Sequence, residues 1–278
     1  MVLVKIDDPK TKETYEFYVD DKLKNQLDKK VKVALDKKDE DYVLVIDGDE
    51  RAGKSVFGMQ LARYIDPSFS LDKVCFTPDE FRKAILNAKE KDECIIFDEA
   101  YRGLAAKGAL TEVNRILVSL MMEMGQKNLF IIIILPTFYL LEKYVALWRA
   151  RGLFHVFRSK GRKGYWVFYN KRKKKTLFLK GKKDYGYNYA KSTFRGRFYN
   201  KYCVDKDSYI KKKSESLKKG YKTTRQEKFK EQRDRLLYLI RKQYGLSLNE
   251  LSNVCKLYDV RLKKTQLSDI IAKFKERP

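Results

Sequence analysis

The sequence contains few of the residues that build metal centres and disulfide frameworks. Its 278 residues include one histidine, His155, and four cysteines. The cysteines lack the C-x-x-C spacing of a zinc site and stand far apart, at Cys75, Cys94, Cys203 and Cys255. A structural zinc site is therefore not expected. Scattered cysteines of this kind are typical of reduced core thiols, so we expect a cytoplasmic protein, in the host cytoplasm if it is viral.

Long apolar runs are also missing. The longest, Leu129–Leu135, has seven residues, whereas a membrane-spanning helix needs about 20. The first ten residues, MVLVKIDDPK, contain no apolar signal segment. We therefore expect no membrane segment, and the short apolar run is better explained as a buried parallel strand.

Positive charge dominates the chain and is unevenly distributed. The net charge is +25, from 62 Lys and Arg against 37 Asp and Glu. Residues 1–157 carry a net charge of −1, residues 158–225 carry +20, and residues 226–278 carry +6. A neutral part followed by a basic part favours a polyanionic partner, most simply nucleic acid, with DNA expected before RNA. A solvated basic tail and an anionic membrane surface are the alternatives, although no amphipathic apolar face favours the membrane.

One octapeptide carries most of the functional information. Residues 48–55, here called the glycine loop, read GDERAGKS and match G-x-x-x-x-G-K-[ST], the phosphate-binding loop of nucleotide triphosphatases. In such a loop the backbone N–H groups turn toward phosphate oxygens, and the following helix adds its positive N-terminal end. We expect Lys54 to contact the β- and γ-phosphates of ATP and Ser55 to ligate Mg²⁺. The expected nucleotide contacts are Gly48, Asp49, Glu50, Arg51, Ala52, Gly53, Lys54, Ser55 and Val56.

The segments around the glycine loop support this interpretation. The apolar, β-branched run 42–46 before the loop predicts a buried strand, and residues 56–64 after it have apolar positions at helical spacing. A strand, a glycine loop and a helix in this order form the arrangement that the phosphate site requires.

A pair of acids supplies the second half of the expected site. Asp98 and Glu99 follow the apolar run 94–97, which predicts another buried strand. A carboxylate at the end of such a strand can hold Mg²⁺, a role that we expect for Asp98. A second carboxylate can polarise the attacking water, so Glu99 is the expected catalytic base and the expected reaction is hydrolysis.

The alternation of elements predicts an α/β fold with three layers and a mainly parallel sheet. Strands are expected at 42–46, 74–76, 94–97, 129–135 and 153–157, with helices from 77, at 110–126 and at 138–148. A hairpin (2–6 and 13–19) and a surface helix (20–37) are expected before them. We expect four parts: residues 1–37, an ATPase core at 38–160, a basic hairpin and arm at 161–225, and a helical module at 226–278.

The basic part mixes lysine with aromatic residues. Runs 164–170 and 176–179 are expected to pair as a hairpin, and residues 181–225 to form a partly flexible arm. Lysines would neutralise phosphates while aromatic rings stack on bases. The expected contacts are Tyr185, Tyr187, Tyr189, Phe194, Phe198 and Tyr199. In the last part, helices expected at 229–244, 247–257 and 265–274 predict either a helix-turn-helix module or a plain helical bundle.

The glycine loop, the Asp98–Glu99 pair and a further strand at 129–135 resemble the ASCE class of P-loop ATPases, which includes RecA-like, AAA+ and FtsK–HerA-type motors. The resemblance covers residues 42–158. The layout of this segment is similar to that of viral DNA-packaging ATPases. It implies a RecA-like core in which the strand at 129–135 lies between those carrying the loop and the acids. Thr137, just after this strand, takes the position of a polar sensor. The resemblance also implies an oligomer, for example a ring.

Motors of this class use an arginine to neutralise charge on the γ-phosphate, and the resemblance offers three places for it. Arg149 and Arg151 match the position of a finger that reaches a neighbouring subunit. Arg51, inside the glycine loop, matches the arginine that acts within its own subunit in terminase-type motors. Arg102 is a further candidate.

These features together predict Mg²⁺-dependent ATP hydrolysis coupled to nucleic-acid binding. The expected protein is an oligomeric DNA translocase, packaging ATPase or helicase-type motor of a mobile element. The alternative is an ATP-regulated DNA-binding replication initiator, partition factor or helicase loader. An RNA-directed ATPase is a third hypothesis.

Overall fold

The computed structural model describes residues 1–9, 11–38, 40–89, 91–98, 118–119, 127–218, 225–257, 262 and 264–275. Contacts between residues divide the chain into two units, Met1–Gly220 and Tyr221–Pro278. The first unit contains a mixed α/β fold, and the second contains helices.

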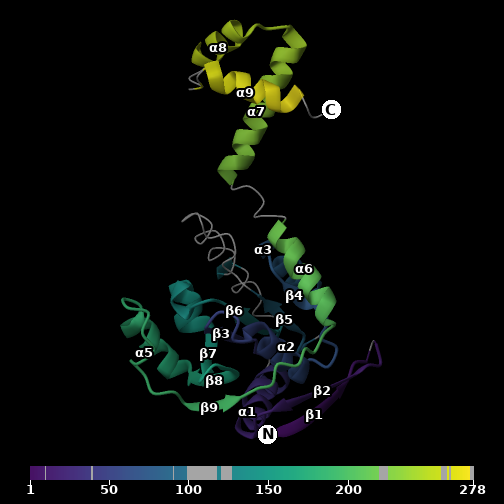
Figure 1. Ribbon diagram of the computed structural model, residues 1–278, viewed down its shortest axis with the longest axis vertical. Helices are drawn as coiled ribbons and strands as arrows, with labels where there is room; N and C mark the ends of the chain where they lie inside the picture. Colours follow the sequence, from purple (N-terminus) through teal and green to yellow (C-terminus); the bar gives the residue numbers. More distant parts are fainter. Residues whose placement is uncertain are drawn as a thin grey trace. The chain divides into compact units, whose positions relative to one another are not determined.

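A seven-stranded sheet organises the first unit (Figure 1). Its strand order is β4-β5-β6-β3-β7-β8-β9; the first five strands are parallel, and β8 pairs antiparallel with both β7 and β9. The mostly parallel sheet and the position of β6 between β3 and β5 are as expected. The strands are β3 (Tyr42–Gly48), β4 (Val74–Cys75), β5 (Cys94–Phe97), β6 (Phe130–Ile134), β7 (Ala150–Ser159), β8 (Arg162–Asn170) and β9 (Phe194–Arg197).

Helices cover both faces of this sheet, which makes it compatible with a three-layer fold. One face packs against α2 (Lys54–Ile65), α1 (Asp21–Gln26), the π-helix η1 (Leu27–Lys37) and the hairpin of β1 (Val2–Asp7) and β2 (Thr14–Val19). The other face packs against α3 (Pro78–Asn87), the short helices η4 (Phe138–Leu140) and η5 (Val145–Arg149), and α5 (Lys171–Gly181). A single turn, η2 (Leu71–Lys73), precedes β4. Strands β3, β5 and β6 are buried on both faces, which explains their nearly continuous apolar sequences.

Two expected elements of this unit are wrong. Residues 138–148 do not form one helix but the two short helices η4 and η5, with an intervening bend. Residues 176–179 are not a strand but part of α5. The side chain of Asn170 caps this helix by accepting from the Lys173 N–H at 3.0 Å. The hairpin partner of β8 is β7 instead, across a turn at residues 160–161.

The expectation of a partly flexible arm is also wrong for residues 182–218. This segment forms β9 and the helix α6 (Lys206–Lys218). Its residues 194–209 pack onto the α2 face of the sheet, whereas Tyr187 and Ala190 pack against the core on the other face. Phe198 is buried against Phe57, with ring centroids 4.8 Å apart, so it is a core residue rather than a nucleic-acid contact. Among the expected contacts, the exposed ones are Tyr185, Tyr189 and Tyr199. The aromatic residues of this segment therefore serve partly to attach it to the sheet.

The second unit contains α7 (Arg225–Tyr244), α8 (Leu248–Leu257) and α9 (Lys264–Lys275), close to the three expected helices. Ser247 and Glu250 form a capping box at the start of α8: each side chain accepts from the backbone N–H of the other. A small core joins the helices through Leu237, Leu251, Cys255, Leu267 and Ile271.

Several expectations lie outside the described residues. These include Glu99, Arg102 and all of the helix expected at 110–126 apart from residues 118 and 119. Within the described ranges, no helix combines the length and the apolar character needed to cross a membrane.

A buried lysine makes the stability of the first unit depend on pH. Lys174 is fully buried in α5 and donates to the Ala146 carbonyl oxygen of η5. Burial, with the charges of Lys171 and Lys175 nearby, lowers the pKa of Lys174 from 10.5 to about 7. Below the folded-state pKa both states carry the charge, so the cost of burying it is fully present. Between the two values the unfolded chain binds a proton that the folded chain has lost, so stability rises with pH.

We predict that Lys174→Met removes this rise. The wild-type free energy of unfolding should increase between about pH 7 and pH 10 relative to that of the variant, because only the wild type gives up the buried charge. Urea denaturation across this range measures the difference, with Lys182→Met, at an exposed position of the same region, as the control. Parallel pH profiles for wild type and Lys174→Met would contradict the prediction.

Candidate functional site

The glycine loop connects β3 to α2 at the edge of the sheet where the parallel strands end. Gly48, Arg51 and Gly53 all have left-handed backbone conformations, with φ of 121°, 58° and 99°. Gly48 has no alternative, since a Cβ there would lie 1.9 Å from the carbonyl oxygen of Val156 on the neighbouring strand. That carbonyl accepts the N–H of Asp49 at 2.9 Å, which holds the start of the loop against β7. The glycines therefore permit a close backbone approach that other residues would block.

Lys54, the first residue of α2, turns back over the loop. Its ammonium donates to the carbonyl oxygens of Gly48 (2.6 Å) and Asp49 (2.8 Å). Burial lowers the pKa of Lys54, and the carboxylates of Asp47 and Asp98 oppose that shift. The lysine thus sits partly desolvated at the first turn of a helix, where its charge interacts strongly with an anion.

A cavity of about 720 Å³ opens over the glycine loop. The loop and the start of α2 form one side of it, and the segment from Asn200 to Lys213 forms the other. Its size falls within the range of small-molecule sites. The cationic side chains among its lining residues are Arg51, Lys54, Lys163 and Lys213. These charges, together with the helix N-terminus, favour a ligand with several negative charges.

Asp98 directly follows β5 at the same edge and is fully buried. Its Oδ2 accepts a hydrogen bond of 2.7 Å from the Tyr209 hydroxyl of α6, and the Lys213 ammonium lies 3.9 Å away. The Tyr209 hydroxyl also interacts with Ser55. Burial, followed by the charge of Asp98, raises the pKa of Tyr209, so this residue stays a neutral donor.

The same contacts place two oxygen-bearing side chains around one point. Ser55 and Asp98 both reach the Tyr209 hydroxyl, and among the described residues the Oδ1 of Asp98 has no hydrogen-bond partner. A hydroxyl and a carboxylate are ligands that Mg²⁺ prefers. An orphaned buried carboxylate oxygen in this position fits a cation, so Ser55 and Asp98 could hold Mg²⁺.

A second polar cluster at this edge was missed by sequence reasoning. Asp47, the last residue before the glycine loop, is fully buried and accepts the Phe138 N–H at 2.7 Å and the Tyr187 hydroxyl. His155 Nδ1 lies 2.9 Å from its other oxygen. Thr137, the expected sensor, contacts the Tyr187 hydroxyl at 3.5 Å. Thr137 therefore belongs to a network around Asp47, next to the loop. The signal in the sequence that could have indicated this cluster is Asp47 itself, a polar residue at the end of the apolar run 42–46.

The structure separates the arginine candidates. Arg51 lines the cavity over the glycine loop. Arg149 pairs with Asp41, and Arg151 pairs with Glu40 at 2.8 Å. Because β7 begins beside Val43, these two arginines lie at the amino end of β3, opposite the loop. They do not approach the loop of their own chain.

Sequence reasoning also missed Arg158. Its guanidinium donates to the Glu50 carbonyl oxygen at 2.8 Å, and its backbone N–H donates to the Asp49 carboxylate at 3.1 Å. Arg158 therefore fixes the outer part of the glycine loop. In the sequence Arg158 is one basic residue among many. Its position beside the glycine loop follows from the register of β7 along β3.

No model of a known protein family matches this chain, and a search of curated proteins found no match either.

We predict that Gly48→Ala destabilises the first unit more than Gly161→Ala does. Both glycines have positive φ, but a Cβ at Gly161 would meet nothing within 4 Å. Gly161→Ala should lower the free energy of unfolding by about 1 kcal/mol, or the melting temperature by roughly 2–4 °C, from backbone strain alone. At Gly48 the overlap with Val156 adds a backbone displacement, so the loss should be several-fold larger. Thermal denaturation followed by circular dichroism measures both, and equal losses would show that the close approach is not required.

Proposed function

We propose that the chain is a Mg²⁺-dependent ATPase with a RecA-like core of the ASCE class. The observation that supports this most strongly is that Ser55 of the glycine loop and Asp98 both contact the hydroxyl of Tyr209, a residue that lines the cavity over the loop. They come from β3 and β5, which end at the same edge with β6 between them. This is the strand arrangement that the family resemblance implies, and the proposal assigns phosphate binding to the glycine loop and metal binding to Asp98 on this basis.

In this proposal the residues of the loop bind the triphosphate. The backbone N–H groups of the loop and of the first turn of α2 face the phosphates, and Lys54 exchanges its two carbonyl partners for β- and γ-phosphate oxygens. Ser55 and Asp98 hold Mg²⁺, which neutralises phosphate charge. A metal held by Ser55 and by Oδ2 of Asp98 would stand where the Tyr209 hydroxyl now contacts both residues, so it would displace that hydroxyl. Glu99 remains the proposed base for the attacking water.

Neutralisation of the γ-phosphate can come from the same chain. Arg51, Lys163 and Lys213 all line the cavity over the loop. Of the arginines considered, Arg51 has the placement that suits action within one subunit. Arg149 and Arg151 would have to leave their carboxylate partners and act on a neighbouring subunit of an oligomer, such as a ring.

The proposed partner is nucleic acid, with DNA preferred. The net charge of +20 over residues 158–225 is the supporting observation. Because this basic segment packs onto the nucleotide cavity, hydrolysis and DNA binding can influence each other. We therefore favour an oligomeric DNA translocase, packaging or helicase-type motor acting in the cytoplasm. A DNA-binding initiator, partition factor or loader regulated by ATP is the second candidate, favoured if the three helices of the second unit read a specific sequence.

The decisive measurement is the ATPase rate with and without DNA. We predict that Lys54→Ala and Asp98→Asn each lower turnover by at least about 100-fold, because each removes charge stabilisation of the transferred phosphoryl group. DNA binding should stay largely intact in both variants, and Lys22→Ala, at an exposed site on α1, should behave as wild type. A wild-type protein that hydrolyses no ATP with Mg²⁺ and DNA would rule out the proposal. Preference for one duplex site over random DNA at physiological salt would instead favour the regulatory candidate.

We also predict that Tyr209→Phe lowers the Mg²⁺ concentration for half-maximal ATPase activity. The Tyr209 hydroxyl competes with the metal for Asp98, and a hydrogen bond to a charged group is worth about 1.5–3 kcal/mol, so the shift should be roughly tenfold or more. Tyr244→Phe, at an exposed position of α7, controls for loss of a tyrosine hydroxyl. A requirement for more Mg²⁺ in Tyr209→Phe would mean that the hydroxyl supports the metal site rather than competing for it.

A further inference from the structure

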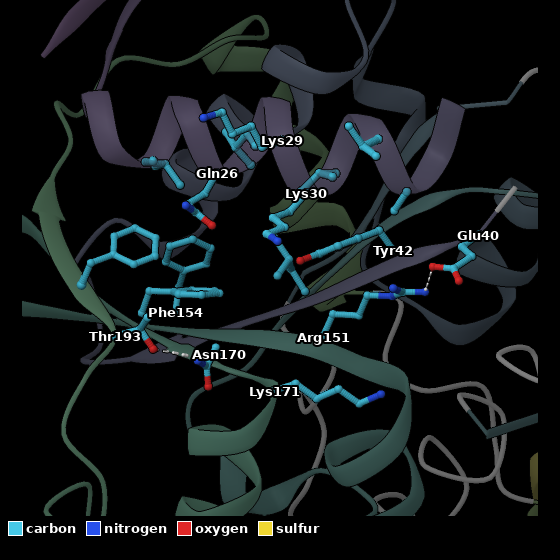
Figure 2. A pocket seen from close by; sticks show the side chains of 18 of the residues that line it. Gln26, Lys29, Lys30, Glu40, Tyr42, Arg151, Phe154, Asn170, Lys171 and Thr193 are labelled. Atoms are coloured by element: carbon cyan, nitrogen blue, oxygen red, sulfur yellow. Dashed lines mark hydrogen bonds and ion pairs between the residues drawn. The ribbon is translucent and has the colours of Figure 1, made fainter. Parts of the chain in front are cut away.

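A second cavity, of about 460 Å³, lies between η1 and the sheet (Figure 2). It shares no lining residue with the cavity over the glycine loop. Its strand residues include Tyr42 and Leu44 near the start of β3, whereas the glycine loop follows the end of that strand. The two cavities therefore belong to opposite ends of β3.

Aromatic rings from three strands line the sheet side of this second cavity, and aliphatic side chains of α1 and η1 line the opposite side. Phe154, Phe168 and Phe194 come from β7, β8 and β9. The ring centroid of Phe168 lies 4.7 Å from that of Phe154 and 4.9 Å from that of Phe194. Phe168 and Phe194 are only partly buried, so they offer ring surface to a ligand. A flat aromatic ligand gains stacking energy from such a surface.

Cations surround the opening. Of the described residues that line the cavity, Glu40 is the single acid, and it pairs with Arg151 at 2.8 Å. The lysines of the lining are Lys29, Lys30, Lys38 and Lys171. Figure 2 shows Lys30 extending from the helix toward the strands. The local charge is thus strongly positive and complements an anion at the opening.

Hydrogen-bonding groups lie beside the rings. The amide of Gln26 points from the helix toward the aromatic side chains in Figure 2. Asn170 and Thr193 lie on the strand side, where the Thr193 hydroxyl accepts the Asn170 N–H at 3.2 Å. An acyl chain could not use these groups, whereas a nucleobase has both a π face and hydrogen-bonding edges.

We propose that this cavity binds a base of single-stranded nucleic acid, with the flanking phosphates on the lysines. The base stacks against Phe168 and Phe194, and Gln26 is placed to contact its edge. This inference rests on the proposed nucleic-acid partner but not on ATP hydrolysis. It assigns the contact with single-stranded nucleic acid to η1 and the β8–β9 surface rather than to the exposed tyrosines of residues 185–199.

The test uses the full chain without nucleotide and a single-stranded oligonucleotide of about 16 nucleotides. Lys30→Glu should weaken binding several-fold and lower the dependence of log K on log salt by at least about 0.7, the loss expected for one phosphate contact. Phe194→Leu keeps an apolar side chain but removes a ring, so affinity should fall about five-fold or more. Lys37→Glu makes the same charge change on η1 outside the lining and should have little effect.

A photocrosslink gives a readout independent of affinity. An oligonucleotide carrying 5-iodouracil should crosslink to the aromatic residues of the cavity, identified by mass spectrometry, and Lys30→Glu should reduce the yield. If the wild type binds the oligonucleotide but crosslinks map elsewhere and Lys30→Glu binds like Lys37→Glu, this inference is wrong and the proposed function stands. If the wild type binds no nucleic acid, both fail. Binding to phosphatidylglycerol vesicles that depends on Lys30, without oligonucleotide binding, would assign the cavity to lipid instead.

Discussion

Within the first unit, the hydrogen bond from Tyr209 to Asp98 joins the helix α6 of the basic segment to the end of β5 in the sheet. A fully buried carboxylate is costly unless it is hydrogen-bonded, and Asp98 receives its bond from a residue 111 positions later. Forming this bond requires α6 to lie over the glycine loop, and the intervening segment then packs Phe198 against Phe57 of α2. The basic segment is therefore not a tail attached to a finished core. It closes the candidate site and brings Lys213 beside Asp98.

This arrangement gives the proposed nucleotide site a mechanical consequence. A ligand can shift a conformational equilibrium only by its difference in affinity for the two states. A metal that takes the place of the Tyr209 hydroxyl between Ser55 and Asp98 would favour the state in which α6 is displaced. The energy available is that of the contacts exchanged, a hydrogen bond to a buried charge against metal coordination. Binding at the loop and the position of a basic helix are then parts of one equilibrium.

The sequence was most informative where a pattern is local. Strands β3, β5 and β6 are continuous apolar runs, and the glycine loop has fixed spacing, so both were found where expected. Residues 176–179 were not, because four residues fit a strand as well as a helix and the buried face of α5 includes a lysine, Lys174, that hides the apolar stripe. The cluster around Asp47 joins residues 108 and 140 positions away, which no spacing reveals. Only the register of the parallel strands brings such residues together.

Net charge along the sequence also differs from local charge in space. Residues 1–157 have a net charge of −1, yet they supply Lys29, Lys30 and Lys38 to the opening of the second cavity. At physiological ionic strength a charge acts over about 8 Å, so distant acids of the same segment do not cancel these lysines. The folding of η1 against β7 and β8 adds Arg151 and Lys171 to them. Two basic sites thus arise at opposite ends of β3, and each can attract phosphate independently of the other. In the proposed function, a strand of nucleic acid and a nucleotide triphosphate would therefore bind different surfaces of this unit without competing.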